Sequence, residues 1–175
     1  MADRNSLRTV RNLVGALTIT CGVALVVYFG AIPRGDDGNQ MAAVSYTQEL
    51  GQARRAAPFP VVAPVGLPDE WRANSVTYRG TGDHGTTWHL GFVTPDDEYV
   101  ALEQGSEKSA GFVRKVTRGA RATGESRQVA GEEWARYEGR TYDALVHEGD
   151  GVTTVVTGTG SLEQMELMVK ALKEK

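Results

Sequence analysis

Cysteine is almost absent from the sequence, since Cys21 is the only one among 175 residues. From residue 33 onward there is none, so this part of the chain folds without disulfides and offers no thiolate to a metal. Its stability must come from a hydrophobic core. About 115 residues follow Pro60, and a domain of that size buries roughly two-thirds of its surface, which is enough for independent folding.

Histidine is also scarce. The sequence has three: His84, His89 and His147. None stands in a metal-ligand spacing such as H-x-x-x-H. If Trp88, Leu90 and Phe92 point inward from a strand, His89 points to solvent or to a second layer, and we interpret it as a surface histidine. The alternative is a general base, for which His89 and His84 are the candidates.

Sequence motifs for catalysis or nucleotide binding are missing as well. There is no G-x-S-x-G, and Ser106 has no lysine three residues on. Residues 80–85, GTGDHG, match G-x-G-x-x-G, but a strand pattern follows where a nucleotide site needs a helix, so we expect a hairpin loop and no nucleotide. Residues 95–99, PDDEY, lack the spacers of a calcium loop and indicate a solvated turn. We therefore assign no catalytic, cofactor-binding or metal-ligating residue and expect no cofactor, although the fold can still bring catalytic residues together.

Positive charge is not in excess. Once Asp3 and three early arginines, Arg4, Arg8 and Arg11, are set aside, 16 of the 19 Lys and Arg residues remain against 21 of the 22 Asp and Glu residues, a net charge of −5. Proteins that bind nucleic acid draw affinity from neutralising phosphates. This balance argues against a nucleic-acid partner.

The sequence does contain a long apolar run, because residues 13–32 carry no charge. As a helix with a rise of about 1.5 Å per residue, the run is roughly 30 Å long, the thickness of the hydrocarbon core of a bilayer. It is longer than the apolar region of a cleavable signal and has no small-x-small site at its end. Lipidation at Cys21 is disfavoured, because Thr18 and Thr20 occupy positions that need a large aliphatic and a small residue. We expect an uncleaved transmembrane helix that contacts membrane lipid.

The distribution of arginine gives this helix an orientation. Three arginines precede it, and only Arg34 closely follows it. By the positive-inside rule, residues 1–12 stay in the cytoplasm and the chain after the span is exported. We expect a single-pass plasma-membrane protein with a linker over 33–60 that contains a short helix, and an extracytoplasmic domain over 61–175.

Beyond the linker, the hydrophobic period becomes two residues. Residues 74–80, 86–94 and 98–104 carry alternating, β-branched and aromatic residues, which predicts three consecutive antiparallel strands. Similar patterns over 127–139, 141–148 and 152–158 predict three more strands, with a tight hairpin turn at EGDG, 148–151. The chain therefore has an antiparallel sheet.

Three helices accompany the sheet. The first starts at Ser45, with Gln48 at capping-box spacing, and ends at Pro58; the proline-rich residues after it run extended and bring Trp71 to the core. The second covers 108–116. The third covers 161–175, where Ser161 and Gln164 form a capping box and lysines lie at the far end. We expect the third helix, and the second with it, to pack on one face of the sheet in an α+β fold.

The predicted strands and helices also contain a possible internal repeat. When the sequence is compared with itself at an offset of 54 residues, Leu102 aligns with Val156, and a predicted helix follows each of the two strands. This suggests a duplicated βββα unit. The alternative is that the likeness is accidental, because strand-rich domains resemble one another at any offset.

The three tryptophans, Trp71, Trp88 and Trp134, form either a core or the lining of a ligand cleft, and we favour the core.

Several motifs together resemble a known family. They are the Pro-rich G-L-P-x-x-W over 66–71, T-W-H-x-G-F-x-T-P over 87–95, L-E-Q over 102–104 and V-T-G-T over 156–159. The chain resembles, over nearly its whole length, the actinobacterial family called domain of unknown function 4245. The resemblance implies a membrane anchor with one exported domain, and it implies no activity.

Three functional hypotheses remain. We favour a binding or accessory module of the cell envelope with an envelope protein as its partner, because no set of acid, base, nucleophile or metal ligands converges in the sequence. An envelope hydrolase is the alternative, and a pocket that holds a histidine within about 3 Å of a carboxylate or hydroxyl would favour it. A domain that binds a lipid or glycan fragment would show an open apolar groove, and a partner-binding domain a flat apolar patch.

Overall fold

The computed structural model describes residues 45–81, 85–106, 110–149 and 151–174. The predicted cytoplasmic segment 1–12 and the predicted membrane span 13–32 lie outside these residues, as does His84. Among the described residues, no helix is long and apolar enough to cross a bilayer.

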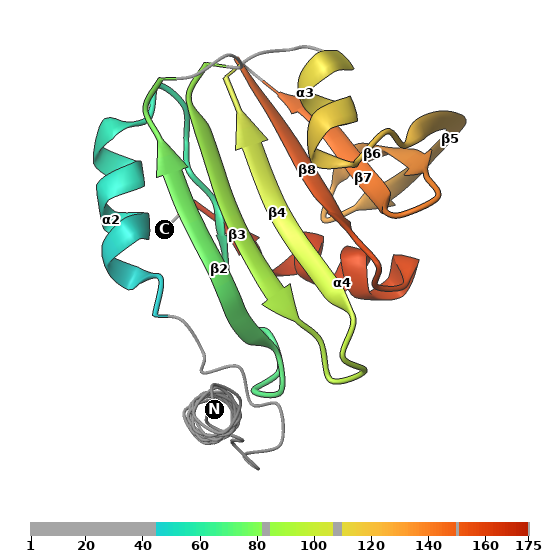
Figure 1. The fold of residues 1–175 in the computed structure, drawn as a ribbon, viewed down its shortest axis with the longest axis horizontal. Coiled ribbons are helices and arrows are strands. Elements are labelled where there is room, and N and C mark those ends of the chain that lie inside the picture. The colour runs from blue at the N-terminus through green and yellow to red at the C-terminus, as the bar shows by residue number, and fades with distance from the viewer. Residues whose placement is uncertain (1–44, 82–84, 107–109, 150, 175) are drawn as a thin grey trace, which may run out of the picture. The chain divides into compact units, whose positions relative to one another are not determined.

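The domain is built on one seven-stranded antiparallel sheet (Figure 1). Its strand order is β2-β3-β4-β8-β7-β6-β5. The predicted strands over 74–80, 86–94 and 98–104 are confirmed as β2 (Arg72–Arg79), β3 (Thr87–Val93) and β4 (Tyr99–Gly105), which pair consecutively. The other strands are β5 (Arg121–Val129), β6 (Glu132–Glu138), β7 (Asp143–Gly149) and β8 (Val152–Gly158).

The main core lies on the face of the sheet that carries α4 (Leu162–Ala171). Alternate residues of the central strands point to this face, because successive side chains of a strand point to opposite sides. Trp88, Leu90, Leu102 and Val156 contribute no exposed surface and pack in one cluster with Met168 of the helix. The three tryptophans all belong to this cluster, which confirms that they form a core.

The middle helix, α3 (Ala110–Val116), packs on the opposite face. Phe112 and Val113 contact Ala144, Val146 and Val155 in a second, smaller cluster. Figure 1 shows α3 in front of the sheet and α4 behind it. The prediction that both helices share one face is therefore wrong. Since Val155 and Val156 are neighbours in β8 and are both buried, the strand needs cover on both sides.

The C-terminal helix begins as predicted, with the capping box of Ser161 and Gln164 in place. It ends earlier than predicted, at Ala171. Leu172–Lys173 then form β9, which pairs with β1 (Ala63–Pro64). Lys173 therefore lies beyond the helix, and Lys170 is the basic residue of its last turn.

The first helix, α2 (Thr47–Ala56), also packs on the core, where Ala53 is fully buried. Its predicted capping box is wrong, because Tyr46 occupies the N-cap position and makes no side-chain capping bond. The aromatic ring of Tyr46 packs edge-on against Phe92, with ring centroids 6.0 Å apart. This contact with the core, in place of a cap, fixes the start of the helix. The segment after it also packs inward, since Phe59 and Val61 are buried, and it brings Trp71 to the core as expected.

Residues 127–139 form a hairpin where we expect a single strand. Val129 ends β5 and Glu132 begins β6. Between them, Ala130 and Gly131 both have positive φ, 56° and 91°, as a tight two-residue hairpin turn requires. All the residues of β5 before Val129 are exposed, so this edge strand has no apolar alternation for sequence reasoning to detect.

The sheet places β2-β3-β4 beside β8-β7-β6, so β4 and β8 meet at the centre. Leu102 pairs directly with Val156, the residue that the offset of 54 aligns with it. Two equal units related by a twofold axis through this pair would have their helices on the same face. Because α3 and α4 lie on opposite faces, the two halves are not exact repeats, and the duplication stays a prediction.

Candidate functional site

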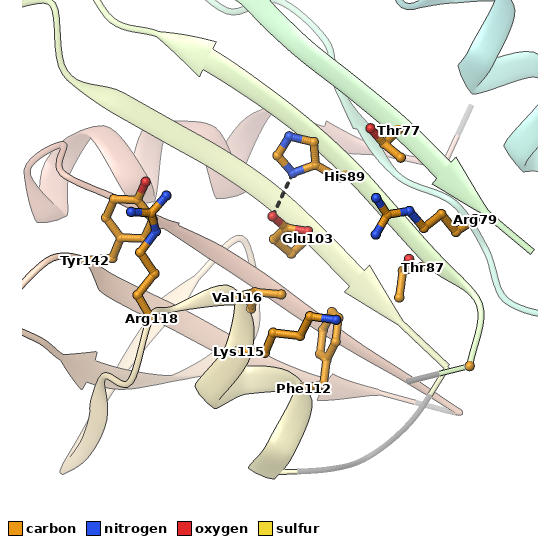
Figure 2. A pocket seen from close by; sticks show the side chains of 11 residues that line it. Thr77, Arg79, Thr87, His89, Glu103, Phe112, Lys115, Val116, Arg118 and Tyr142 are labelled. Carbon is orange, nitrogen blue, oxygen red and sulfur yellow. Dashed lines mark hydrogen bonds and ion pairs between the residues drawn. The ribbon is translucent and has the colours of Figure 1, made fainter. Parts of the chain in front are cut away.

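A cleft of about 500 Å³ lies on the face of the sheet that carries α3. The helix has only seven residues and packs over β7 and β8, so part of the sheet beside it remains open. Gly105 allows this packing, because a Cβ there would lie 2.9 Å from the ring of Phe112. The cleft is lined by Thr77, Arg79, Gly85, Thr87, His89, Glu103, Phe112, Lys115, Val116, Arg118 and Tyr142 (Figure 2).

The floor of the cleft carries a hydrogen-bonded imidazole and carboxylate. His89 of β3 and Glu103 of β4 are direct cross-strand partners. The Nδ1 of His89 lies 2.7 Å from Oε1 of Glu103, and their side chains are 24% and 15% exposed. Ligands can therefore reach the pair from the cleft, and it is shielded enough for the interaction to be strong.

The other ring nitrogen of His89 contacts a serine. Ser75 Oγ lies 2.9 Å from His89 Nε2 and 3.0 Å from Oδ1 of its neighbour Asn74. A bulge in β2 between Ala73 and Ser75 sets Ser75 opposite Gly91. A Cβ on Gly91 would overlap Ser75 Oγ and would lie 2.7 Å from the hydroxyl of Tyr99. The missing side chain at Gly91 therefore makes room for this group of polar residues.

Tyr99, whose hydroxyl lies close to Ser75, has a perturbed pKa. Burial raises the pKa of the Tyr99 phenol, and its hydrogen bond with Ser75 partly opposes that effect. Nearby Glu103 also raises this pKa. The hydroxyl thus stays protonated above the usual pH range.

The direction of the hydrogen bonds bears on what Ser75 can do. Its hydroxyl has one proton, and this proton is donated to Asn74 Oδ1. The Nδ1 of His89 faces a carboxylate oxygen, which can only accept, so in a neutral imidazole Nδ1 donates to Glu103 and Nε2 is an acceptor toward Ser75 Oγ. Asn74 Oδ1 therefore competes with His89 Nε2 for the one proton of Ser75, and a serine whose proton goes to the amide is not activated by the imidazole. If the side-chain amide of Asn74 were reversed, its nitrogen would donate to Ser75 Oγ, and Ser75 would donate its own proton to His89 Nε2.

Three cations surround this pair. Figure 2 shows Arg79 on the β2 side, Lys115 on α3, and Arg118 with Tyr142 at one end of the cleft. Arg118 lies over the ring of Tyr142, 4.8 Å from its centroid, a cation–π contact. Within the described part of the chain, none of the three forms an ion pair with a carboxylate.

The predicted candidate residues are distributed as follows. His89 is not a plain surface histidine, because the second layer formed by α3 turns its face of the sheet into a cleft. His147 lies elsewhere, with Nδ1 3.0 Å from the carbonyl oxygen of Glu133 and its ring 5.4 Å from that of Trp134. Gly85 has a φ of 68° and is followed by strand β3, as predicted, where a nucleotide site needs a helix.

Two segments to which we assigned no chemistry have structural roles. Asp96 and Asp97 lie in the turn between β3 and β4, as expected, and Ser106 accepts a hydrogen bond from the backbone of Thr86. The described residues contain no cluster of three His, Cys, Asp or Glu side chains that could hold a metal.

Sequence reasoning missed Ser75, Glu103 and the three cations. The pairing of His89 with Glu103 could have been found, because a hairpin that joins 86–94 to 98–104 through the PDDEY turn fixes the register. Ser75 depends on a bulge, and Lys115 depends on which face of the sheet carries α3. Neither leaves a signal in the sequence.

A second groove of about 670 Å³ lies elsewhere in the domain. It is lined by apolar residues such as Val129, Trp134 and Leu172, together with polar residues that include Gln104 and Lys173. Its mixed lining differs from the open apolar groove that would mark a domain that binds a lipid or glycan fragment.

The fold and cleft define a single α+β domain with a cation-lined cleft on one face of its sheet. The chain belongs to the family described as a protein of unknown function (DUF4245), whose model matches residues 6–172. This confirms the resemblance seen in the sequence motifs. No curated protein matches the chain significantly.

Proposed function

We propose that this protein is a membrane-anchored binding module of the cell envelope, and that its ligand enters the cleft beside α3. The anchor is the uncharged run 13–32, and the arginines before it favour export of the domain. An envelope protein partner belongs to the same proposal. The observation that carries it is the open cleft, in which functional groups from β2, β3, β4 and α3 converge.

Binding explains the cleft better than structure alone does. A cleft of about 500 Å³ is within the usual range for small-molecule sites. Within the described residues, none of its cations is paired with a carboxylate, and Arg118 contacts the ring of Tyr142. Polar and charged groups that converge in a cleft are typical of a ligand site.

Native mass spectrometry of the full chain tests this proposal. Thr87 lines the cleft and is half-exposed, so Thr87→Trp fills the cleft with an indole. The exposed Thr123 of β5 gives the control, Thr123→Trp. We expect small molecules to co-purify with the wild type and with Thr123→Trp, and to be lost from Thr87→Trp. Equal retention by all three proteins, or none by any, would count against a ligand site in the cleft.

The location is tested separately. Alkaline phosphatase fused after residue 60 is active only if that residue is exported. We expect activity in the fusion and none from a cytoplasmic reporter at the same position. The opposite result would reverse the proposed orientation.

An envelope hydrolase is the second candidate. In its favour, Ser75, His89 and Glu103 lie in the order hydroxyl, imidazole and carboxylate, with contacts of 2.9 Å and 2.7 Å. This meets the condition that we set for an enzyme, and it is the geometry of a nucleophile, a base and a residue that orients the base. Against it, Ser75 donates its proton to Asn74, and Ser75 is not among the residues that line the cleft.

A fluorophosphonate probe decides between the two candidates, because it labels a serine only when a base activates it. The binding module predicts no adduct on Ser75, and the same slow hydrolysis of a p-nitrophenyl ester by wild type and Ser75→Ala. A hydrolase predicts an adduct on Ser75 by peptide mapping, and loss of both the adduct and the hydrolysis in Ser75→Ala.

A further inference from the structure

We infer that the ligand of the cleft is a small anion, a carboxylate or a phosphate, with an apolar part. The inference rests on the proposed function and names the chemistry of its ligand. Three observations support it: the charge of the cleft, the positions of its cations, and the apolar side chains that line the rest of it.

The charge of the cleft is opposite to that of the domain around it. The chain from residue 34 onward has a net charge of −5, whereas the described residues that line the cleft include three cations, Arg79, Lys115 and Arg118, and one carboxylate, Glu103. Glu103 is hydrogen-bonded to His89 at 2.7 Å. Positive charge is therefore concentrated in this cleft, where the local potential favours an anion.

The positions of the cations suit an oxyanion. Arg79 comes from β2 and Lys115 from α3, so they reach the cleft from opposite walls (Figure 2). The hydroxyls of Thr77 and Thr87 also line it. A guanidinium presents two parallel N–H donors to a carboxylate or phosphate, and an ammonium adds a point charge. An anion between the two walls would receive donors from both.

The remaining lining is apolar or aromatic. Val116 contributes from α3, and the ring of Tyr142 stands at one end with Arg118 over it. A bare inorganic anion would leave these surfaces unused. A ligand with an apolar or ring portion would cover them while its charged group meets Arg79 and Lys115.

Saturation-transfer NMR on the full chain in lipid nanodiscs tests the inference, with signals from empty nanodiscs subtracted. The probes share one ring: benzoate, phenyl phosphate, benzyl alcohol and benzylamine. We expect at least one anion to bind, and the neutral and cationic probes to bind at least about tenfold more weakly, since each charge-assisted contact is worth roughly a factor of ten or more. Comparison of benzoate with phenyl phosphate shows which anion is preferred.

Two variants of the same helix make the test specific. Lys115→Gln removes a cation that lines the cleft, whereas Arg114→Gln removes its exposed neighbour, which lines a different pocket. We expect Lys115→Gln and Arg79→Gln each to weaken anion binding by about tenfold, and Arg114→Gln to leave it unchanged. Affinity should also fall as salt is raised.

The outcomes separate this inference from the proposed function. If benzyl alcohol or benzylamine binds as tightly as the anions, or if Lys115→Gln and Arg114→Gln behave alike, the cleft remains a ligand site and the anion inference is wrong. If none of the four probes binds, the anion inference is also wrong, and the co-purification experiment with Thr87→Trp decides the proposed function.

Discussion

Two glycines of the sheet hold positions that no other residue can take. Gly91 leaves room for Ser75 and Tyr99 on one side of β3. Gly158, at the end of β8, lies so close to the backbone of Tyr99 that an added Cβ would overlap its carbonyl oxygen and lie 3.0 Å from the Cα of Val100. Backbone atoms cannot turn aside as a side chain can, so the second position is the less tolerant.

We predict that Gly158→Ala lowers the free energy of unfolding by about 3 kcal/mol, the upper end of the usual penalty for overpacking. Gly149→Ala is the matched control in β7, because its Cβ would meet its nearest neighbour, His147, at 3.6 Å. Urea unfolding followed by tryptophan fluorescence measures both. Equal stability of the two variants would show that β4 and β8 are not in such close contact.

Tyr99 predicts a dependence of stability on alkaline pH. Its pKa in the folded domain is raised above the ordinary 10.0, chiefly by burial. The folded state thus retains a proton that the unfolded chain loses. The stabilisation is complete below pH 10.0 and is lost as the pH rises through the folded-state pKa. Tyr99→Phe should lose less stability than the wild type over this range, with Tyr137→Phe as the control. Identical alkaline profiles for wild type and Tyr99→Phe would contradict the assignment.

His89 shows what sequence can predict at the residue scale. Alternation with Trp88 and Leu90 assigns it to the opposite face of the sheet, and that is correct. Whether that face meets water depends on α3, which packs against β7 and β8, residues distant in sequence. Periodicity assigns a face to each residue of a strand but does not predict what lies over that face.

At the scale of elements, helix α4 covers one face of the sheet with buried side chains that include Met165 and Met168. Met168 is fully buried, whereas the adjacent Leu167 is 38% exposed. We predict that Met168→Ala costs about 2–5 kcal/mol of stability, as large-to-small changes in cores do, and that Leu167→Ala costs about 1 kcal/mol or less. Thermal unfolding of both variants checks this. A larger loss for Leu167→Ala would mean that another face of the helix meets the sheet.

The start of α4 offers a second test. Ser161 accepts a hydrogen bond from the backbone N–H of Gln164, and the side chain of Gln164 accepts one from the N–H of Ser161. Ser161→Ala removes the hydrogen bond that the Ser161 hydroxyl accepts and should lower the free energy of unfolding of the domain by about 1 kcal/mol. Ser45→Ala, at an exposed serine before α2, is the comparison and should be neutral. A neutral Ser161→Ala would indicate that water replaces the cap.

The elements that sequence reasoning predicted well have strong local signals. The strands β2, β3 and β4 alternate, and α4 has both a cap and an apolar face. The errors occur where a contact distant in sequence decides the structure. The start of α2 depends on the packing of Tyr46 on Phe92, and the helical pattern of α4 gives way at Leu172 to a pairing with Pro64.

For the whole molecule, two conclusions come from different sources. The α+β architecture follows from hydrophobic pattern and is confirmed. The cleft follows from the assembly of β2, β3, β4 and α3, which a pattern along the chain does not contain, and its location outside the cell is proposed from the apolar run and its arginines.

One measurement addresses the accessible cleft and the exported domain together. In a Cys21→Ala background, single cysteines are placed in the cleft (Thr87→Cys), beneath α3 (Val155→Cys) and before the apolar run (Ser6→Cys), and intact cells are treated with a membrane-impermeant maleimide. We predict that Thr87→Cys is labelled at once, Val155→Cys only after denaturation, and Ser6→Cys only after the membrane is permeabilised. Labelling of Thr87→Cys that requires permeabilisation would place the domain inside the cell, and labelling that requires denaturation would show that the cleft is closed.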